Sequence, residues 1–170
     1  MVLTRSELIG ALQHEVHILL HLAGKLEPTM LDYRPTPKQR SALELLKYLS
    51  IMGPSLVQVA LSPSGAFDAA AWTVAEKAAA ERGFEETLAA IAAQKEGYAA
   101  LLSGVPDATF REEIAPWGTK TSRGAFIVAL VLGGCAAYRT QLFLYLKACG
   151  RDELGTMNLW AGADVPAAAV

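Results

Sequence analysis

Three histidines have the spacing that most directly suggests metal binding in this sequence. His14, His17 and His21 are three and four positions apart, so a helix would place them on one face. Neutral imidazoles one turn apart can share a divalent cation. They fall on the polar side of the expected helix, however, where a solvated or interface surface is the simpler interpretation. We therefore keep a metal site at these histidines as an alternative only.

The two cysteines are the other residues that could do chemistry. Cys135 and Cys149 fall on one predicted helix, residues 122–150, and a rise of about 1.5 Å per residue separates them by about 21 Å. A disulfide needs Cα atoms within about 7 Å, so the pair cannot form one within the chain. We expect a cytoplasmic protein with reduced thiols. Cys135 has no base or positive field in its predicted surroundings, which favours a small buried residue over a nucleophile.

The helix predicted for residues 122–150 organises the rest of the chain. Residues 125–137 are all apolar or glycine, which predicts a helix that is buried on every side. This run is shorter than the ~20 residues that span a bilayer, and polar residues 139–141 follow it, so we predict a core helix and no membrane partner. The stripe expected to face the bundle interior consists of Val131, Gly134, Tyr138, Gln141 and Tyr145.

Capping boxes predict where other helices begin. Thr4, Ser41 and Thr73 are each followed three residues later by Glu, which satisfies the free N–H groups of a first turn. Gly53-Pro54 is predicted to kink the second helix or end its regular part. A short extra helix should precede a third long helix over residues 84–102, and the Leu159-Trp160 pair is expected to dock back on the bundle.

Composition limits the class of protein further. The chain has 170 residues, of which 52% are hydrophobic and 19% charged, so we predict an ordered all-α domain over residues 1–160. Residues 161–170 form a tail that is a candidate for disorder. The net charge of −2 and the lack of a basic block argue against nucleic acid as a partner. The N-terminal residues lack the pattern of a signal peptide.

Two stretches resemble motifs of the DinB-like (DinB/YfiT) family. Arg34-Pro35 followed by SALELLKYL resembles the family's second-helix region, and YRTQLFLYLKACG resembles its last-helix motif, His-Arg-x-Gln-Leu followed by a Tyr-Leu-Arg-like segment and Gly. The resemblance implies a four-helix bundle with up-down-down-up connectivity and often a homodimer. It also implies a divalent metal held by three histidines, one on the second helix and two at i, i+4 on the last.

The residues at those three metal-binding positions differ from the family pattern. They are Tyr48, Gly134 and Tyr138, and neither a neutral phenol nor a glycine is a useful metal ligand. No cofactor is therefore predicted. We expect a metal-free protein that binds a small ligand in a bundle pocket at this position, lined by these three residues with Cys135 and Gln141.

Three other interpretations remain open on the sequence. The two tyrosine rings could simply fill the space of a lost metal, with each hydroxyl bonded internally. The chain could be a thiol-dependent transferase acting with glutathione, bacillithiol or mycothiol at an unconventional metal site. It could also be a structural or stress-associated dimer that binds no ligand. A homodimer is the expected assembly under the family resemblance.

Overall fold

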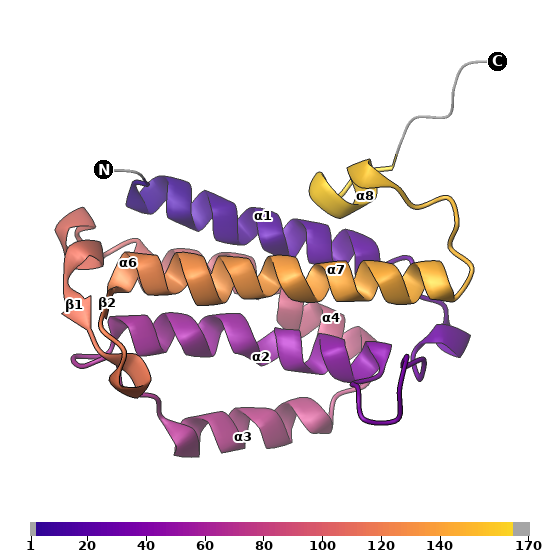
Figure 1. Ribbon diagram of the computed structural model, residues 1–170, viewed down its shortest axis with the longest axis horizontal. Coiled ribbons are helices and arrows are strands. Elements are labelled where there is room, and N and C mark those ends of the chain that lie inside the picture. The colour runs from indigo at the N-terminus through magenta and orange to yellow at the C-terminus, as the bar shows by residue number, and fades with distance from the viewer. Residues whose placement is uncertain (1–2, 165–170) are drawn as a thin grey trace.

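The structure, a computed structural model, describes residues 3–164 and is mostly helical (Figure 1). Its helices are α1 Arg5–Ala23, α2 Ala42–Leu61, α3 Ala69–Ala80, α4 Phe84–Ala92, α5 Gln94–Leu102, α6 Arg123–Phe126, α7 Gly133–Ala148 and α8 Thr156–Trp160. A π-helical turn over Ile127–Leu132 joins α6 to α7 into one continuous helix. Strands β1 Glu113–Ile114 and β2 Thr121–Ser122 form a small antiparallel ladder that the sequence did not predict.

Two of the three predicted capping boxes are confirmed. Thr4 and Ser41 each accept a backbone N–H from the glutamate three residues on, and that glutamate bonds back to the cap. The third is wrong, because α3 begins earlier, at Ala69. Asp68 caps α3 by accepting the Ala71 N–H at 2.9 Å, and an aspartate carboxylate is a stronger cap than an interior threonine.

Proline 54 lies inside α2, which continues to Leu61. Side chains from α5 supply hydrogen bonds beside it: Gln94 donates to the Leu49 carbonyl at 2.9 Å, and the Tyr98 hydroxyl donates to Gln94 at 3.2 Å. Neighbouring helices can support a proline-containing helix in this way. The helix predicted over residues 84–102 is divided at Ala93 into α4 and α5.

The helices α1, α2, α4–α5 and α6–α7 surround one hydrophobic core. Contacts between their ends fix their relative directions. Arg5, at the start of α1, donates to the Val105 carbonyl just beyond the end of α5 at 3.0 Å. Arg123, at the start of α6, donates to the Ala60 carbonyl near the end of α2 at 2.6 Å. Fully buried members of the core include Leu12, Leu22, Leu45, Leu46, Ile91, Leu102, Ile127, Leu142 and Leu146.

The expectation that the 122–150 helix is buried on every side is wrong. Only 22% of the residues in its most apolar window are buried, and Val128, Leu130 and Leu144 are 45%, 41% and 58% exposed. One face of α6–α7 packs against α1 and α2, and among residues 3–164 no element covers the opposite face. By length and composition alone, Arg123–Ala148 could also cross a membrane, a property that core helices of soluble proteins share.

Two peripheral helices complete the fold (Figure 1). The Ala-rich α3 packs chiefly against α2 and buries only Ala79. The predicted docking of Leu159-Trp160 is confirmed, because α8 packs on α1 and Arg139 of α7 donates to the Leu159 carbonyl and stacks over the Trp160 ring at 5.1 Å. Residues 165–170 of the predicted tail lie outside the described residues.

Candidate functional site

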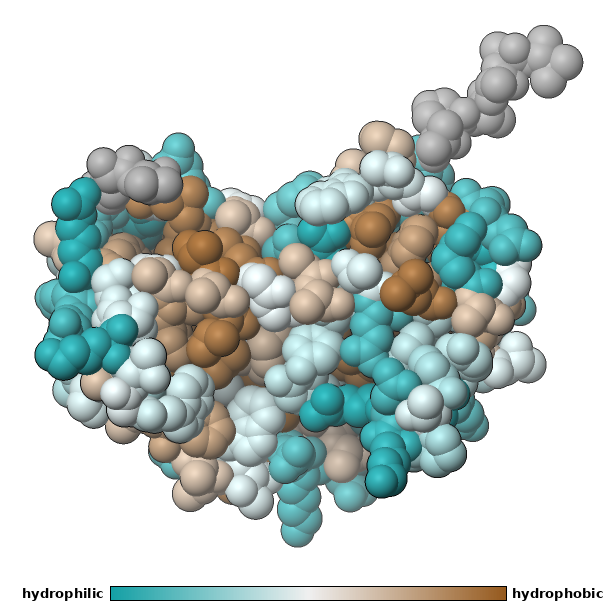
Figure 2. Space-filling model, in the orientation of Figure 1, coloured by the Kyte–Doolittle hydropathy of each residue, from teal (hydrophilic) through white to brown (hydrophobic). Residues whose placement is uncertain are grey.

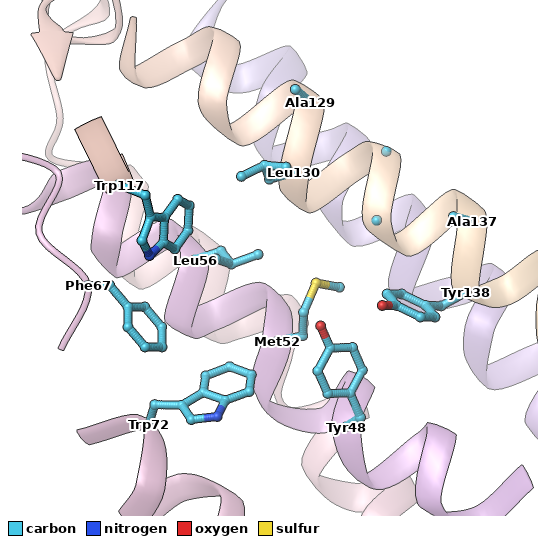
Figure 3. A pocket seen from close by; sticks show the side chains of 12 residues that line it. Tyr48, Met52, Leu56, Phe67, Trp72, Trp117, Ala129, Leu130, Ala137 and Tyr138 are labelled. Atoms are coloured by element: carbon cyan, nitrogen blue, oxygen red, sulfur yellow. The ribbon is translucent and has the colours of Figure 1, made fainter. Parts of the chain in front are cut away.

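A cavity of about 640 Å³ lies between α2, α3 and the α6–α7 helix (Figure 3). Aromatic and other apolar side chains form most of its walls. Its lining residues are Tyr48, Met52, Leu56, Phe67, Trp72, Trp117, Ala129, Leu130, Gly133, Gly134, Ala137 and Tyr138. No formally charged residue is among them, so the cavity is suited to an apolar molecule with few polar groups.

Two tyrosines meet across the cavity from different helices. The Tyr48 and Tyr138 ring centroids are 5.1 Å apart, with an edge-to-face angle of 69°. Figure 3 shows both phenol oxygens directed toward the space between α2 and α7. Burial, followed by hydrogen bonding with Tyr138, raises the pKa of Tyr48 to about 12. The phenol of Tyr48 is therefore neutral at physiological pH and can act as a hydrogen-bond donor.

A row of aromatic rings continues from Tyr48 along one side of the cavity. Trp72 lies 6.0 Å from Tyr48, Phe67 5.8 Å from Trp72, and Trp117 5.9 Å from Phe67, all between ring centroids. The opposite wall is the α7 backbone at Gly133 and its small neighbours. Neighbouring rings are inclined to each other by 67°, 49° and 44°, so this wall offers both ring faces and ring edges to an aromatic molecule.

Trp117 has an unusual backbone conformation at the cavity. Its φ of 51° and ψ of 29° lie in the left-handed region, which bulky residues rarely adopt, and its side chain is 62% exposed. The ring stacks on Phe126 at 5.9 Å, which holds it beside the α6–α7 wall. Strain of this kind is concentrated at ligand-binding sites, where the surrounding structure maintains it.

The three positions that correspond to the family's histidines come together, but they do not form a metal site. All three of Tyr48, Gly134 and Tyr138 line the cavity. A Cβ atom at Gly134 would lie 3.3 Å from the Met52 sulfur, so this methionine occupies the space that a larger residue would need. Within residues 3–164 no three His, Cys, Asp or Glu side chains are grouped to hold an ion. Two phenols and a thioether are a poor set of ligands for a divalent cation.

The other two predicted lining residues lie outside the cavity. Gln141 donates to the Tyr145 hydroxyl, which donates in turn to the Arg40 carbonyl at 3.0 Å. Cys135 is packed against the core beside the cavity. Burial, followed by the nearby Glu15 carboxylate, raises the pKa of its thiol to about 12. A thiol with so high a pKa is protonated at neutral pH, which favours a structural role.

The three histidines of α1 lie away from the cavity. His14 and His17 are exposed and stack with their ring centroids 6.1 Å apart, whereas His21 lies beneath α8 with its Nε2 3.0 Å from Asn158 Nδ2. Burial lowers the pKa of His21. The face of α1 that carries the three histidines, which the sequence left open as an alternative metal site, is thus in part the surface on which α8 docks.

Sequence reasoning missed several residues of the site and its support. Phe67 and Trp117 come from connections whose residues follow no helical period, so no pattern places them at a cavity. Arg139 of α7 forms a buried ion pair with Glu15 of α1 at 2.8 Å. The uncharged run before Arg139 is the only signal that could have suggested a buried arginine with a partner.

Comparison with known proteins identifies the fold by its three-dimensional structure and not by its sequence. No protein-family profile matches the sequence, and no curated protein matches it. In three dimensions the chain has the fold of a DinB-like protein. One solved structure that it resembles is the crystal structure of the DinB-like protein YjoA from Bacillus subtilis, with a TM-score of 0.67, 17% identity, and coverage of 88% of this chain and 95% of that one. The resemblance noted in the sequence is confirmed at the level of the fold.

Cys149 is expected to react with iodoacetamide at pH 8 at least about tenfold faster than Cys135. The raised pKa of Cys135 leaves almost no thiolate at that pH, whereas burial raises the pKa of Cys149, just after the end of α7, by less. Peptide mass spectrometry after timed quenching gives both rates, and guanidinium-unfolded protein should show equal rates. If Cys135 reacts first in the native protein, its assignment as an inert buried thiol is wrong.

Proposed function

We propose that this protein binds a small, planar, largely apolar organic molecule in the cavity between α2, α3 and α7, without metal chemistry. The observation that supports this most directly is the combination of five aromatic side chains with two tyrosine hydroxyls directed inward. Aromatic walls provide stacking area, and a small number of polar groups fix the orientation of a ligand.

The chemistry of the lining favours a neutral aromatic ligand. The five rings are those of Tyr48, Phe67, Trp72, Trp117 and Tyr138. A planar molecule would lie along this row, with a hydroxyl or carbonyl accepting or donating a bond at the phenols. A formal charge would be costly to bury there, because none of the lining residues carries a countercharge.

We also propose that the four long helical segments follow the up-down-down-up connectivity of the family resemblance. The contacts at the helix ends support this arrangement: α1 begins where α5 ends, and α6 begins where α2 ends. Arg151, just after α7, donates to the carbonyl of Lys25, just after α1, so these two helices end together. Residues of α2 and α7 then face each other across the cavity from antiparallel helices.

1-Naphthol is a suitable probe of the cavity, and we expect it to bind at micromolar to millimolar concentration in buffer containing EDTA. Trp72→Ala should weaken binding about tenfold, because one stacking ring is worth about 1–1.5 kcal/mol. Isothermal titration calorimetry measures both affinities. Trp160→Ala is the matched control, since this indole is 62% exposed on α8, and it should bind as the unaltered protein does.

Two results would contradict the proposed function. One is the absence of binding by 1-naphthol and by related phenols up to their solubility limit. The other is an equal loss of affinity in the Trp72 and Trp160 variants, which would mean that the probe binds at exposed indoles and not in the cavity. Binding that disappears with EDTA would reinstate a metal at the site.

A further inference from the structure

A second cavity lies directly beside the cavity between α2, α3 and the α6–α7 helix. It has a volume of about 270 Å³, and we call it the side cavity. Besides Trp117 it is lined by Pro116, Thr119, Thr121, Phe126, Ala129 and Leu130. Trp117, Ala129 and Leu130 also line the larger cavity, so the two spaces share a wall. A molecule bound in one can therefore extend into the other.

The larger cavity is longer than the aromatic ring system that the proposed function places in it. Figure 3 shows Tyr48 and Tyr138 at one end of the cavity and Trp117 at the other. Tyr138 and Ala129, which line the α6–α7 wall, are nine residues apart, which is about 14 Å along a helix. A naphthol held by the two phenols is shorter than this distance and leaves the Trp117 end empty. A ligand that fills the cavity carries a substituent directed toward Trp117.

The boundary between the two cavities can open without disturbing the core. It consists of Trp117 and Leu130, which are 62% and 41% exposed, together with the small side chain of Ala129. Exposed side chains change rotamer rapidly. The left-handed backbone conformation of Trp117, with a φ of 51°, is one that bulky residues rarely adopt, and it places the indole where it borders both cavities.

The lining of the side cavity suits an aliphatic chain. None of its lining residues carries a formal charge, and Pro116, Ala129 and Leu130 are aliphatic. The Thr121 hydroxyl donates to the Ser122 carbonyl at 3.4 Å, so this polar group already has a partner. Figure 2 shows that hydrophobic side chains gather along the α6–α7 helix, which forms the wall common to both cavities. Each methylene buried in such surroundings strengthens binding by up to about fourfold.

We propose that the ligand of this protein is a phenol with an aliphatic substituent on its ring, and that the substituent passes between Trp117 and Leu130 into the side cavity. The ring lies in the larger cavity with its hydroxyl at Tyr48 and Tyr138, and the chain extends along the row of aromatic side chains toward α6. This inference rests on the proposed function, which it narrows to alkyl-substituted aromatic molecules.

A polar substituent would fit a different space. A cavity of about 300 Å³ between α2 and α3 shares Phe67 and Trp72 with the larger cavity and is lined by the polar residues Ser55, Gln58 and Asp68. The rings of Phe67 and Trp72 are 5.8 Å apart and only partly exposed, so this boundary is held more firmly than the one at Trp117 and Leu130. The side cavity is for this reason the favoured path for a chain.

Isothermal titration calorimetry with a matched pair of phenols tests the proposal. 4-Butylphenol and 4-(3-hydroxypropyl)phenol have equal numbers of non-hydrogen atoms and differ only at the end of the chain. We expect 4-butylphenol to bind at least about tenfold more tightly than phenol, because several methylenes are buried. We expect the hydroxypropyl compound to bind about tenfold more weakly than 4-butylphenol, because burial of an unpaired hydroxyl is costly.

A variant that fills the side cavity separates the two cavities. Thr119 lines the side cavity and not the larger one, and its extended backbone accepts an aromatic residue. Thr119→Phe should weaken binding of 4-butylphenol at least about tenfold and leave that of 1-naphthol within about twofold. Lys120→Phe is the matched control, because Lys120 is 76% exposed in the same hairpin and lines neither cavity. It should bind both compounds as the unaltered protein does.

Three results would overturn this inference alone. Equal affinities for phenol and 4-butylphenol, with 1-naphthol still bound, would leave the proposed function without the side cavity. Equal affinities of the Thr119 and Lys120 variants for 4-butylphenol, both shown by circular dichroism to be folded, would place the chain elsewhere. Tighter binding of the hydroxypropyl compound would direct the substituent to the polar cavity between α2 and α3. If neither 1-naphthol nor any of these phenols binds, the proposed function fails and this inference fails with it.

Discussion

Replacing Arg123 with methionine is expected to lower the free energy of unfolding by about 3 kcal/mol. The Arg123 side chain is only 8% exposed. Its guanidinium donates to the Ala60 and Ser62 carbonyls, both at 2.6 Å, and pairs with Glu112 at 3.1 Å.

The substitution is costly because the Arg123 side chain caps the C-terminal end of α2. The last carbonyls of α2 have no partner within the helix, and Arg123 donates to one of them, that of Ala60, and to the carbonyl of the C-cap residue Ser62. Methionine keeps the apolar stem and removes every donor, so buried carbonyls lose their bonds and Glu112 loses its countercharge. Since Arg123 also begins α6, the substitution should weaken the junction of α2 and α6.

Chemical denaturation by urea, followed by circular dichroism, measures the loss. Lys120→Met is the control, because Lys120 pairs with Glu113 in the same small hairpin at 2.9 Å but is 76% exposed. An exposed pair of this kind contributes little to stability, so no measurable change is expected. Equal effects of the two substitutions would show that Arg123 acts as an ordinary surface charge.

Gly53→Ala is expected to destabilise the protein by about 2–3 kcal/mol, although alanine is the better helix former. A Cβ atom at Gly53 would lie 2.0 Å from the Tyr98 hydroxyl oxygen and 3.3 Å from Cζ. Tyr98 is 1% exposed, so its ring has little room to move. Displacing it would also break the hydrogen bonds through Gln94 to the Leu49 carbonyl, beside the proline of α2.

A second glycine tests whether the loss of stability at Gly53 comes from the clash with Tyr98. Gly97 lies inside α5 with nothing within 4 Å of its added Cβ, so Gly97→Ala should stabilise the protein by about 0.5–1 kcal/mol. Adding Tyr98→Phe to Gly53→Ala removes the clashing oxygen and should recover part of the loss. Thermal and urea unfolding of the unaltered protein, of Gly53→Ala and Tyr98→Phe singly, and of the double variant completes a double-mutant cycle. No rescue by Tyr98→Phe would locate the strain elsewhere.

Local signals in the sequence determined most of the helical framework. The Thr4 and Ser41 boxes fix where α1 and α2 begin, because a cap depends on residues within one turn. Leu8, Leu12, Leu19, Leu22 and Leu26 recur at helical spacing in the sequence, and all five are buried. The family resemblance also predicted that Tyr48, Gly134 and Tyr138 lie together, because they occupy the positions of the family's three histidines.

Tertiary structure alone decided what surrounds those residues. Phe67, Trp72 and Trp117 reach the cavity from α3 and irregular connections, whose paths depend on long-range packing and leave no period in the sequence. Cys135 and Gln141 share the helix of Tyr138, but the rotation of that helix turns them out of the cavity. Likewise, hydrophobicity predicted that residues 125–137 are buried without saying by what, because a sequence records which surfaces avoid water but not whether the same chain covers them.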